Sequence, residues 1–256
     1  ISLHYYTTNW SNKGSATEFG EELYFDILQR CLSIERTIDR HITIMDRYDP
    51  RKRIGLIFDE WGTWYNVEPG TNPGFLFQQN SLRDAFVAAL TFNYLNERCD
   101  RIKMANIAQT INVLQALIFT RDADMLLTPT YHVFDLYKAH HDALLLPQVL
   151  KAPEYTYKGR SLPAISVSSS RLEDGQVNIS IVNIDPGSDI KMVIELRGDE
   201  FKSVSGDILT APRINSHNTF ENKDVVKPEP FKDVKIRKNT IELVVPAKSI
   251  IQLKAM

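Results

Sequence analysis

The stretch Ile54-Gly55-Leu56-Ile57-Phe58-Asp59-Glu60-Trp61-Gly62 decides how this chain of 256 residues is interpreted. An apolar run stops abruptly at two carboxylates, and a tryptophan follows at once. Short apolar runs of this kind are typical of strands that are buried on both faces, as in parallel sheets. Residues 54–58 therefore predict a buried parallel strand that ends at two acids.

These two acids lie where enzymes built on parallel strands carry their chemistry, at the C-terminal end of a strand. Because side chains alternate along a strand, Asp59 and Glu60 are expected to point to opposite faces and not to form a catalytic pair with each other. Glu60 is the catalytic candidate, although an isolated acid pair more often caps the following turn. The aromatic residues Trp61, Trp64 and Tyr65 favour catalysis, because sugar rings stack on aromatic faces.

The composition excludes several classes of protein. Hydrophobic residues make up 43% of the chain and charged residues 24%, which is typical of a globular protein. A formal net charge of -2 gives no reason to expect nucleic acid or an anionic membrane as a partner. No apolar run is long enough to span a bilayer, and no signal-peptide pattern is present.

The first residues, Ile1–Tyr6, resemble a strand that is already under way, without an initiator Met. We therefore expect the chain to be part of a longer protein, and a cytoplasmic location and a secreted or periplasmic one both stay open. Cys31 and Cys99 fall on predicted helices and are expected to be small buried hydrophobes. Since the sequence has no zinc-type spacing, Gly-rich phosphate loop or Gly-x-Ser-x-Gly elbow, no metal or organic cofactor is expected.

Strands alternate with helices from Ile1 to about Pro147, which predicts a parallel sheet with right-handed crossovers. The expected strands are 1–6, 54–58 and 101–107, and the expected helices are about 18–48, 81–98 and 133–145. Apolar residues three and four apart define the first helix, which Pro50 ends. Ser81 is the expected N-cap of the second helix, with Asp84 in its first turn.

From about Leu150 onwards, short alternating segments are separated by Gly, Pro, Asn and Asp. This pattern predicts an antiparallel β-sandwich. The expected strands are 165–169, 177–184, 190–196, 208–210, 240–245 and 249–253. Residues 215–232 are polar and contain prolines, so they are expected to form a surface loop.

Several segments of the first half together resemble one family. Residues 59–65 with 68–74 resemble the nucleophile region of the family 51 α-L-arabinofuranosidases. Residues 2–6 are similar to the preceding barrel strand of that family, 104–113 to its last barrel strand, and 128–134 to the exit into its last helix. The resemblance covers residues 1 to about 145 nearly continuously, whereas the second half resembles the family only in its type of fold.

The resemblance implies a fold of class α/β plus all-β. Residues 1–149 would be the last three βα units of a (β/α)8 TIM barrel, and residues 150–256 a jelly-roll-like C-terminal β-sandwich. The implied reaction is the release of terminal α-L-arabinofuranosyl units, with retention, from arabinose-containing oligo- or polysaccharides such as arabinan or arabinoxylan. Members of the family commonly form homo-oligomers.

The resemblance also implies roles for five residues. Glu60 matches the catalytic nucleophile, Tyr6 the tyrosine that hydrogen-bonds it, and His4 a histidine two places earlier. Trp64 matches a tryptophan that lines the arabinose pocket, and Gln109 a glutamine that contacts the sugar. Simpler interpretations exist for three of them, since His4 could be a core histidine, Gln109 could bond the sheet edge, and Tyr6 could be an ordinary barrel-wall aromatic.

A retaining glycosidase needs a second carboxyl group, roughly 5–5.5 Å from the nucleophile, to protonate the leaving oxygen. In the family this acid/base glutamate follows an asparagine on an earlier barrel strand. The one Asn-Glu pair of this chain, Asn96-Glu97, lies at the end of a predicted helix and is interpreted as a decoy. The acid/base group is therefore expected to be absent from this chain, which should be inactive or very weakly active unless it associates with the missing N-terminal part.

Two other functions stay open on the sequence. The chain could come from another TIM-barrel glycosidase, such as a xylosidase or an endo-glucanase. It could also be a non-catalytic carbohydrate-binding or structural module, because a sandwich hosts many functions.

Overall fold

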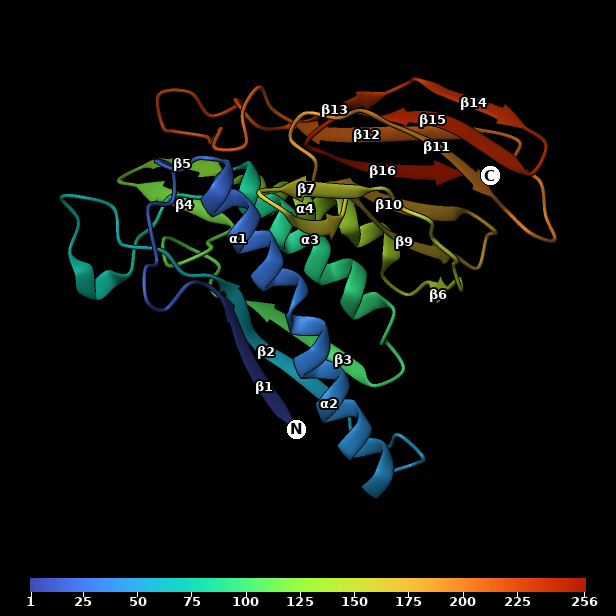
Figure 1. Ribbon diagram of the computed structural model, residues 1–256, viewed down its shortest axis with the longest axis horizontal. Coiled ribbons are helices and arrows are strands. Elements are labelled where there is room, and N and C mark those ends of the chain that lie inside the picture. The colour runs from blue at the N-terminus through green and yellow to red at the C-terminus, as the bar shows by residue number, and fades with distance from the viewer.

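Helices lie between two separate β structures in the computed structural model, which describes residues 1–256 (Figure 1). One β structure is a sheet of three strands, β1 (Ser2–Thr7), β2 (Leu56–Thr63) and β3 (Ile102–Ile107). Both neighbouring pairs are parallel, in the order β1-β2-β3, so the predicted parallel sheet is confirmed. The outer edges of β1 and β3 have no strand partner.

Helices cover one face of this sheet, and the other face is open. Leu56 and Phe58 of β2 are fully buried on the covered face, whereas Ser2, His4 and Met104 on the opposite face are exposed. The expectation that the strand is buried on both faces was therefore wrong for this chain, because nothing within residues 1–256 packs against the second face.

A β-bulge interrupts β2 at Asp59 and Glu60. Four residues of β2, from Ile57 to Glu60, run opposite three residues of β1, from Ser2 to His4, and the pairing with β3 shifts at the same place. The rings of Phe58 and Trp61 stack 6.3 Å apart at an angle of 7°, on one face, although three positions separate them. The extra residue leaves both acids on the open face, so the expectation that they point to opposite faces was wrong.

The first predicted helix is two helices, α1 (Glu21–Leu32) and α2 (Ile34–Tyr48). Ser33 separates them, and its backbone N–H still donates to the carbonyls of Gln29 and Arg30. Its hydroxyl also donates to the Gln29 carbonyl, a bond that bends helices. The apolar stripe of the prediction is retained, since both helices bury it against the sheet and the neighbouring helix.

Helix α3 (Leu82–Asn96) follows its prediction closely, and the Asp84 carboxylate accepts a hydrogen bond from the N–H of the N-cap residue Ser81 at 2.7 Å. Helix α4 (Pro129–Tyr137) begins four residues before its predicted start, because Thr128 caps it and Pro129 suits the first helical position. It then passes into a short 3-10 helix, η2 (Lys138–His140). The predicted helix end at 145 was wrong.

The second β structure is the predicted antiparallel sandwich. Its larger sheet has the strand order β13-β12-β16-β10-β9-β6 and its smaller sheet the order β11-β15-β14. The strands are β6 (Leu144–Leu145), β9 (Ile165–Arg171), β10 (Val177–Asn183), β11 (Ile190–Glu195), β12 (Val204–Thr210), β13 (Pro228–Phe231), β14 (Val234–Arg237), β15 (Thr240–Val245) and β16 (Ser249–Ala255).

Some elements were not predicted. Strands β13 and β14 are among them, as are the two hairpins β4 (Ile118–Arg121) with β5 (Asp124–Leu127) and β7 (Glu154–Tyr157) with β8 (Arg160–Pro163), and the short 3-10 helix η1 (Pro73–Phe75). The interpretation of 215–232 as a surface loop was wrong in part. Asn218 and Val226 are buried there, because the Asn218 amide donates to the carbonyls of Leu127 and Val226.

Helix α3 joins the two β structures. It packs on β2 from one side and on β9 and β10 from the other, and one hydrophobic core contains residues of both parts, including Phe86 of α3 and Val182 of β10. Side-chain hydrogen bonds add to this contact, since Asn93 donates to the Ser166 hydroxyl at 3.0 Å and Asn96 to the Ser168 hydroxyl at 3.0 Å.

Of the two cysteines, Cys31 is buried as expected. Cys99 is exposed, contrary to expectation, because it lies in the turn that follows α3. None of the helices combines the length and the hydrophobicity that a membrane-spanning helix requires.

The lowered pKa of the His140 imidazole predicts that the stability of the protein depends on pH. Its Nδ1 and Nε2 lie 2.7 Å and 2.8 Å from the hydroxyls of Ser170 and Ser180 in the larger sheet, and burial, with His141 nearby, lowers its pKa to about 4. The unfolded chain binds this proton below about pH 6.5, whereas the folded chain does not bind it until about pH 4. The free energy of unfolding should therefore fall by about 3 kcal/mol as the pH decreases through this window.

Urea unfolding between pH 7 and pH 4, for the parent and for His140→Gln, measures this term. Glutamine retains hydrogen-bonding groups but does not titrate, so the variant should lose less stability across the window than the parent. Equal pH slopes for both proteins would contradict the assignment.

Candidate active site

Three predicted residues meet on the open face of the parallel sheet. The register places His4 opposite Glu60 and Tyr6 opposite Gly62. The Tyr6 hydroxyl donates a hydrogen bond to Glu60 Oε1, and His4 Nδ1 lies 3.1 Å from Glu60 Oε2. Each oxygen of the Glu60 carboxylate therefore has its own partner, which fixes the direction in which the carboxylate points.

Tyr6 is suited to remain a hydrogen-bond donor. Burial, and then the neighbouring Glu60 carboxylate, raises the pKa of Tyr6 well above its ordinary value. The phenol therefore keeps its proton at neutral pH and continues to donate a hydrogen bond to Glu60.

Asp59 joins this cluster, which the sequence did not predict. Its Oδ1 lies 3.1 Å from His4 Nε2 and accepts a hydrogen bond from the Ser2 hydroxyl at 3.0 Å. His4 therefore lies between the carboxylates of Asp59 and Glu60. The bulge in β2 causes this arrangement, and strand alternation alone argues against it.

Trp64 stands beside Tyr6, with ring centroids 4.9 Å apart at an angle of 71°. The Thr8 hydroxyl donates to the Trp64 carbonyl at 2.5 Å, so the end of β1 holds the segment that follows β2. Trp64 thus extends the cluster by one aromatic ring beyond Tyr6.

Buried amides hold the backbone that links Glu60 to Trp64. The N–H of Thr63 donates to Gln115 Oε1 at 2.8 Å, and the N–H of Tyr65 donates to Gln78 Oε1 at 2.8 Å. All four residues are buried. These glutamines belong to no motif, so no sequence pattern identifies them as residues that support the site.

Gln109 lies at the same end of the sheet, two residues after the end of β3. The preceding Ala108 donates its N–H to the Trp61 carbonyl at 2.8 Å, which ties this segment to β2. The Gln109 side chain is exposed and makes no hydrogen bond within the chain, so it does not bond the sheet edge. Its backbone N–H donates to the Val113 carbonyl.

The pair Asn96-Glu97 is engaged with the sandwich. Asn96 donates to the Ser168 hydroxyl, and Glu97 accepts a hydrogen bond from the Gln148 side chain at 3.0 Å and contacts Arg98. Both residues stand at the end of α3 that leads into the beginning of β3, away from the strand ends near Trp64. No group of three or more His, Cys, Asp or Glu side chains is arranged to hold a metal ion.

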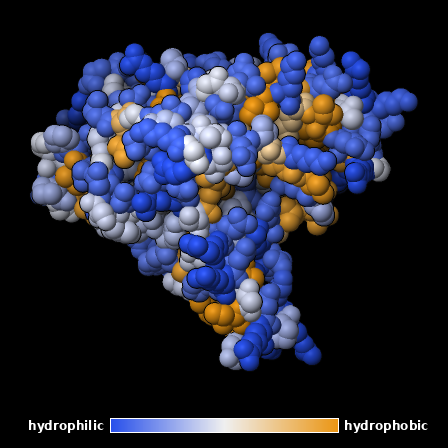
Figure 2. Space-filling model, in the orientation of Figure 1, coloured by the Kyte–Doolittle hydropathy of each residue, from blue (hydrophilic) through white to orange (hydrophobic).

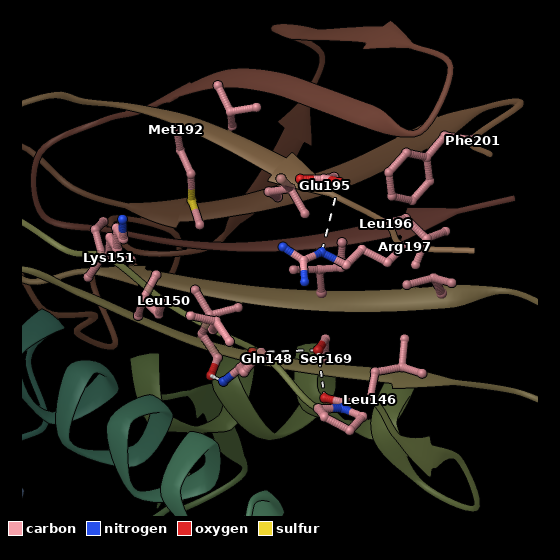
Figure 3. A pocket seen from close by; sticks show the side chains of 18 of the residues that line it. Leu146, Gln148, Leu150, Lys151, Ser169, Met192, Glu195, Leu196, Arg197 and Phe201 are labelled. Carbon is pink, nitrogen blue, oxygen red and sulfur yellow. Dashed lines mark hydrogen bonds and ion pairs between the residues drawn. The ribbon is translucent and has the colours of Figure 1, made fainter. Parts of the chain in front are cut away.

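A cleft lies in the sandwich, between the two sheets (Figure 3). Its volume is about 660 Å³, and mostly apolar side chains from β9, β10, β11 and the segment 146–151 line it. Figure 2 shows hydrophobic residues gathered on this part of the surface. Strand β11 borders the cleft and pairs only with β15, so its other edge is free.

Comparison with known proteins places the chain in a family. The model of the family described as "Alpha-L-arabinofuranosidase C-terminal domain" matches residues 59–249. An intracellular exo-α-L-arabinofuranosidase of Bacteroides ovatus is 48% identical over 99% of this chain and 50% of that protein. An intracellular exo-α-(1→5)-L-arabinofuranosidase of Acetivibrio thermocellus is 27% identical over 88% of this chain and 46% of that protein.

A solved structure is similar throughout. The family 51 arabinofuranosidase of Xanthomonas axonopodis pv. citri superposes with a TM-score of 0.97 at 44% identity, and the match covers 100% of this chain and 52% of that one. The chain spans about half the length of the relatives that it matches. With its sheet-rich fold and C-terminal sandwich, it belongs to the family 51 α-L-arabinofuranosidases, as their C-terminal portion.

Proposed function

We propose that this chain supplies the nucleophile of a retaining, exo-acting α-L-arabinofuranosidase, with Glu60 as that nucleophile. The observation that carries the proposal is the position of Glu60 on the open face of the sheet, with Tyr6 and His4 on its two carboxylate oxygens. A carboxylate held in this way presents a defined oxygen to a sugar that lies over the sheet.

The chemistry proceeds in two displacements. Glu60 attacks the anomeric carbon of a terminal arabinofuranosyl unit, and a glycosyl ester forms as the leaving oxygen departs with a proton from the general acid. Water then attacks the same carbon and gives a proton back to that group, and Glu60 leaves as a carboxylate, so the configuration is retained. Because Tyr6 keeps its proton, its hydroxyl donates a hydrogen bond to the Glu60 carboxylate in the free enzyme. This hydrogen bond is given up as Glu60 forms the ester.

Trp64 and Gln109 are proposed to bind the sugar. The Trp64 ring beside Tyr6 provides an apolar wall for the sugar ring, and the unpaired Gln109 amide can donate to and accept from hydroxyl groups. The preferred substrate class is the terminal arabinofuranosyl groups of arabinose-containing oligo- or polysaccharides, which agrees with the exo-acting relative at 48% identity.

The general acid/base group is proposed to come from outside these residues. We propose that residues 1–149 are the last three βα units of a (β/α)8 barrel and that residues 150–256 are the C-terminal sandwich. Three observations support this assignment: parallel strands with unpaired outer edges, an open sheet face that carries the acids, and relatives about twice as long. An upstream portion would pair with β1 and β3 and bring the second carboxyl group to the substrate.

The cleft in the sandwich supports the same association. The smaller sheet has three strands against six in the larger one, and it leaves the apolar side chains of Ile165, Val167 and Ile179 lining an open cleft. We propose that the upstream portion also covers this cleft and pairs with the free edge of β11. Homo-oligomers of the assembled protein are compatible with this arrangement.

The test compares this chain alone with the same chain produced together with the upstream portion, on a chromogenic aryl α-L-arabinofuranoside. The chain alone should be inactive or at least about 10²–10⁴-fold less active, because it lacks general acid assistance. Size-exclusion chromatography of the two samples shows whether the portions associate.

Full activity of the isolated chain would overturn the proposed division of the site. Failure of the assembled protein to release arabinose, combined with retardation of this chain by arabinan in affinity electrophoresis, would favour a binding module instead.

A further inference from the structure

An exposed tryptophan lies next to the proposed site, on the loop that follows β1. Trp10 is 61% exposed, and its ring centroid is 5.6 Å from that of Trp64, at an angle of 61°. Lys13 Nζ lies over both rings, 5.3 Å from the Trp10 centroid and 4.4 Å from the Trp64 centroid. Trp10 therefore presents an apolar indole face to solvent directly beside the ring of Trp64.

Hydrogen bonds hold the loop that carries Trp10. Within it, the N–H of Ser11 donates to the Asn9 side chain at 3.2 Å and the N–H of Asn12 to the Asn9 carbonyl at 3.0 Å. The N–H of Asn66, on the segment after β2, donates to the Gly14 carbonyl at 2.9 Å. Trp10 is therefore presented by a loop that is tied to the same segment as Trp64.

A continuous series of contacts links Trp10 to Glu60. Glu60 is bonded to Tyr6, the Tyr6 ring packs against Trp64, and Trp64 packs against Trp10. Trp10 is thus one ring farther from the carboxylate than Trp64. A sugar that lies over Glu60 with Trp64 as its wall has its leaving oxygen directed away from Glu60, since displacement proceeds from the opposite side.

We propose that Trp10, together with Lys13, binds the sugar residue to which the scissile arabinofuranosyl group is attached. The ligand is a neutral sugar unit of an arabinose-bearing oligosaccharide, which stacks on the exposed indole, while the Lys13 ammonium donates to its hydroxyl groups. This assignment rests on the proposed function, because it requires that Glu60 be the nucleophile. It makes the loop after β1 a determinant of substrate preference.

The test uses the longer protein and two substrates with different leaving groups. α-L-Arabinofuranosyl fluoride has a leaving group too small to reach Trp10, whereas an arabino-oligosaccharide places a sugar there. The measured quantity is the ratio of kcat/KM for the oligosaccharide to kcat/KM for the fluoride. Trp10→Ala should lower this ratio about tenfold, which corresponds to about 1.4 kcal/mol, and Trp10→Phe should restore most of it.

Tyr48→Ala is the matched control, since Tyr48 is a 78% exposed aromatic residue at the end of α2, at the opposite end of the strands (Figure 1). It should leave the ratio unchanged. An unchanged ratio in Trp10→Ala, or an equal loss on both substrates, would overturn the assignment while leaving the proposed function intact. Failure of the unmodified protein on both substrates would overturn the proposed function, and the assignment with it.

Discussion

Replacing Glu60 with alanine in the longer protein is expected to lower kcat/KM on an aryl α-L-arabinofuranoside by about 10⁴- to 10⁶-fold, as loss of a covalent nucleophile does elsewhere. Glu60 is 39% exposed on the open face, so the substitution should leave the fold intact. The effect should be on kcat more than on KM, because the bond from Glu60 to the anomeric carbon exists only along the reaction path.

Azide distinguishes a lost nucleophile from a lost binding group. Added azide can occupy the space of the missing carboxylate in Glu60→Ala and attack the anomeric carbon once, which gives the β-configured arabinofuranosyl azide and restores turnover. Glu173→Ala is the control, since Glu173 is exposed and has no ion-pair partner within the chain. If Glu60→Ala retained activity near that of the parent, or if azide did not raise its activity, the assignment of Glu60 would be contradicted.

Replacing Trp61 with alanine is expected to lower the free energy of unfolding by about 3–5 kcal/mol, the usual cost of removing a large aromatic ring from a core. Trp61 is 1% exposed, and its ring packs against Phe58, Phe92 and Phe134 at centroid distances of 6.3, 5.5 and 6.2 Å. The residue next to Glu60 thus anchors the bulge of β2 to the helices.

Urea unfolding of the parent, Trp61→Ala and Trp61→Phe measures this effect, with equal m values as the check on two-state behaviour. The indole N–H of Trp61 is buried without a hydrogen-bond partner, so phenylalanine removes an unsatisfied donor while it retains most of the ring. Trp61→Phe should therefore lose less than half as much stability as Trp61→Ala. Equal losses would show that the ring packing is not the cause.

The architecture could be predicted where the hydrophobic pattern and the local signals agree. The strand near 54–58, helix α3 with its cap at Ser81, and the six predicted strands of the sandwich all follow from period and capping. The prediction failed where one residue changes the geometry. The helix break at Ser33 keeps nearly helical angles, φ −68° and ψ −13°, so the apolar stripe continues through it.

Proline explains one missed strand. Pro228 and Pro230 make the segment look like a loop, because proline cannot donate in a sheet ladder. Strand β13 is nevertheless formed, and it lies at the edge of the larger sheet, where half of its backbone groups need no partner in the sheet. The prolines are therefore compatible with a strand at this edge, and interpreting them as a sign of a loop was wrong for Pro228–Phe231.

Some residues of the candidate site could also be predicted, whereas others could not. The resemblance to the family brought His4, Tyr6 and Glu60 together, and the parallel pairing of β1 with β2 is the reason that they meet. Asp59 could not be predicted, since a β-bulge has no signal in a run of apolar residues followed by two acids. Gln78 and Gln115 could not either, because an amide that fixes a backbone segment from a distant part of the chain follows no local pattern.

Helix α3 contributes to a hydrophobic core that the parallel sheet and the sandwich share. Its side chains are buried between the parallel sheet and the sandwich. Strand β6 (Leu144–Leu145), which precedes the proposed boundary at residue 149, already pairs with β9 of the sandwich (Leu144 opposite Arg171). A cut in the chain near residue 149 would expose an apolar surface on both products. The shared core around α3 therefore opposes a hinge motion of the sandwich against the parallel strands.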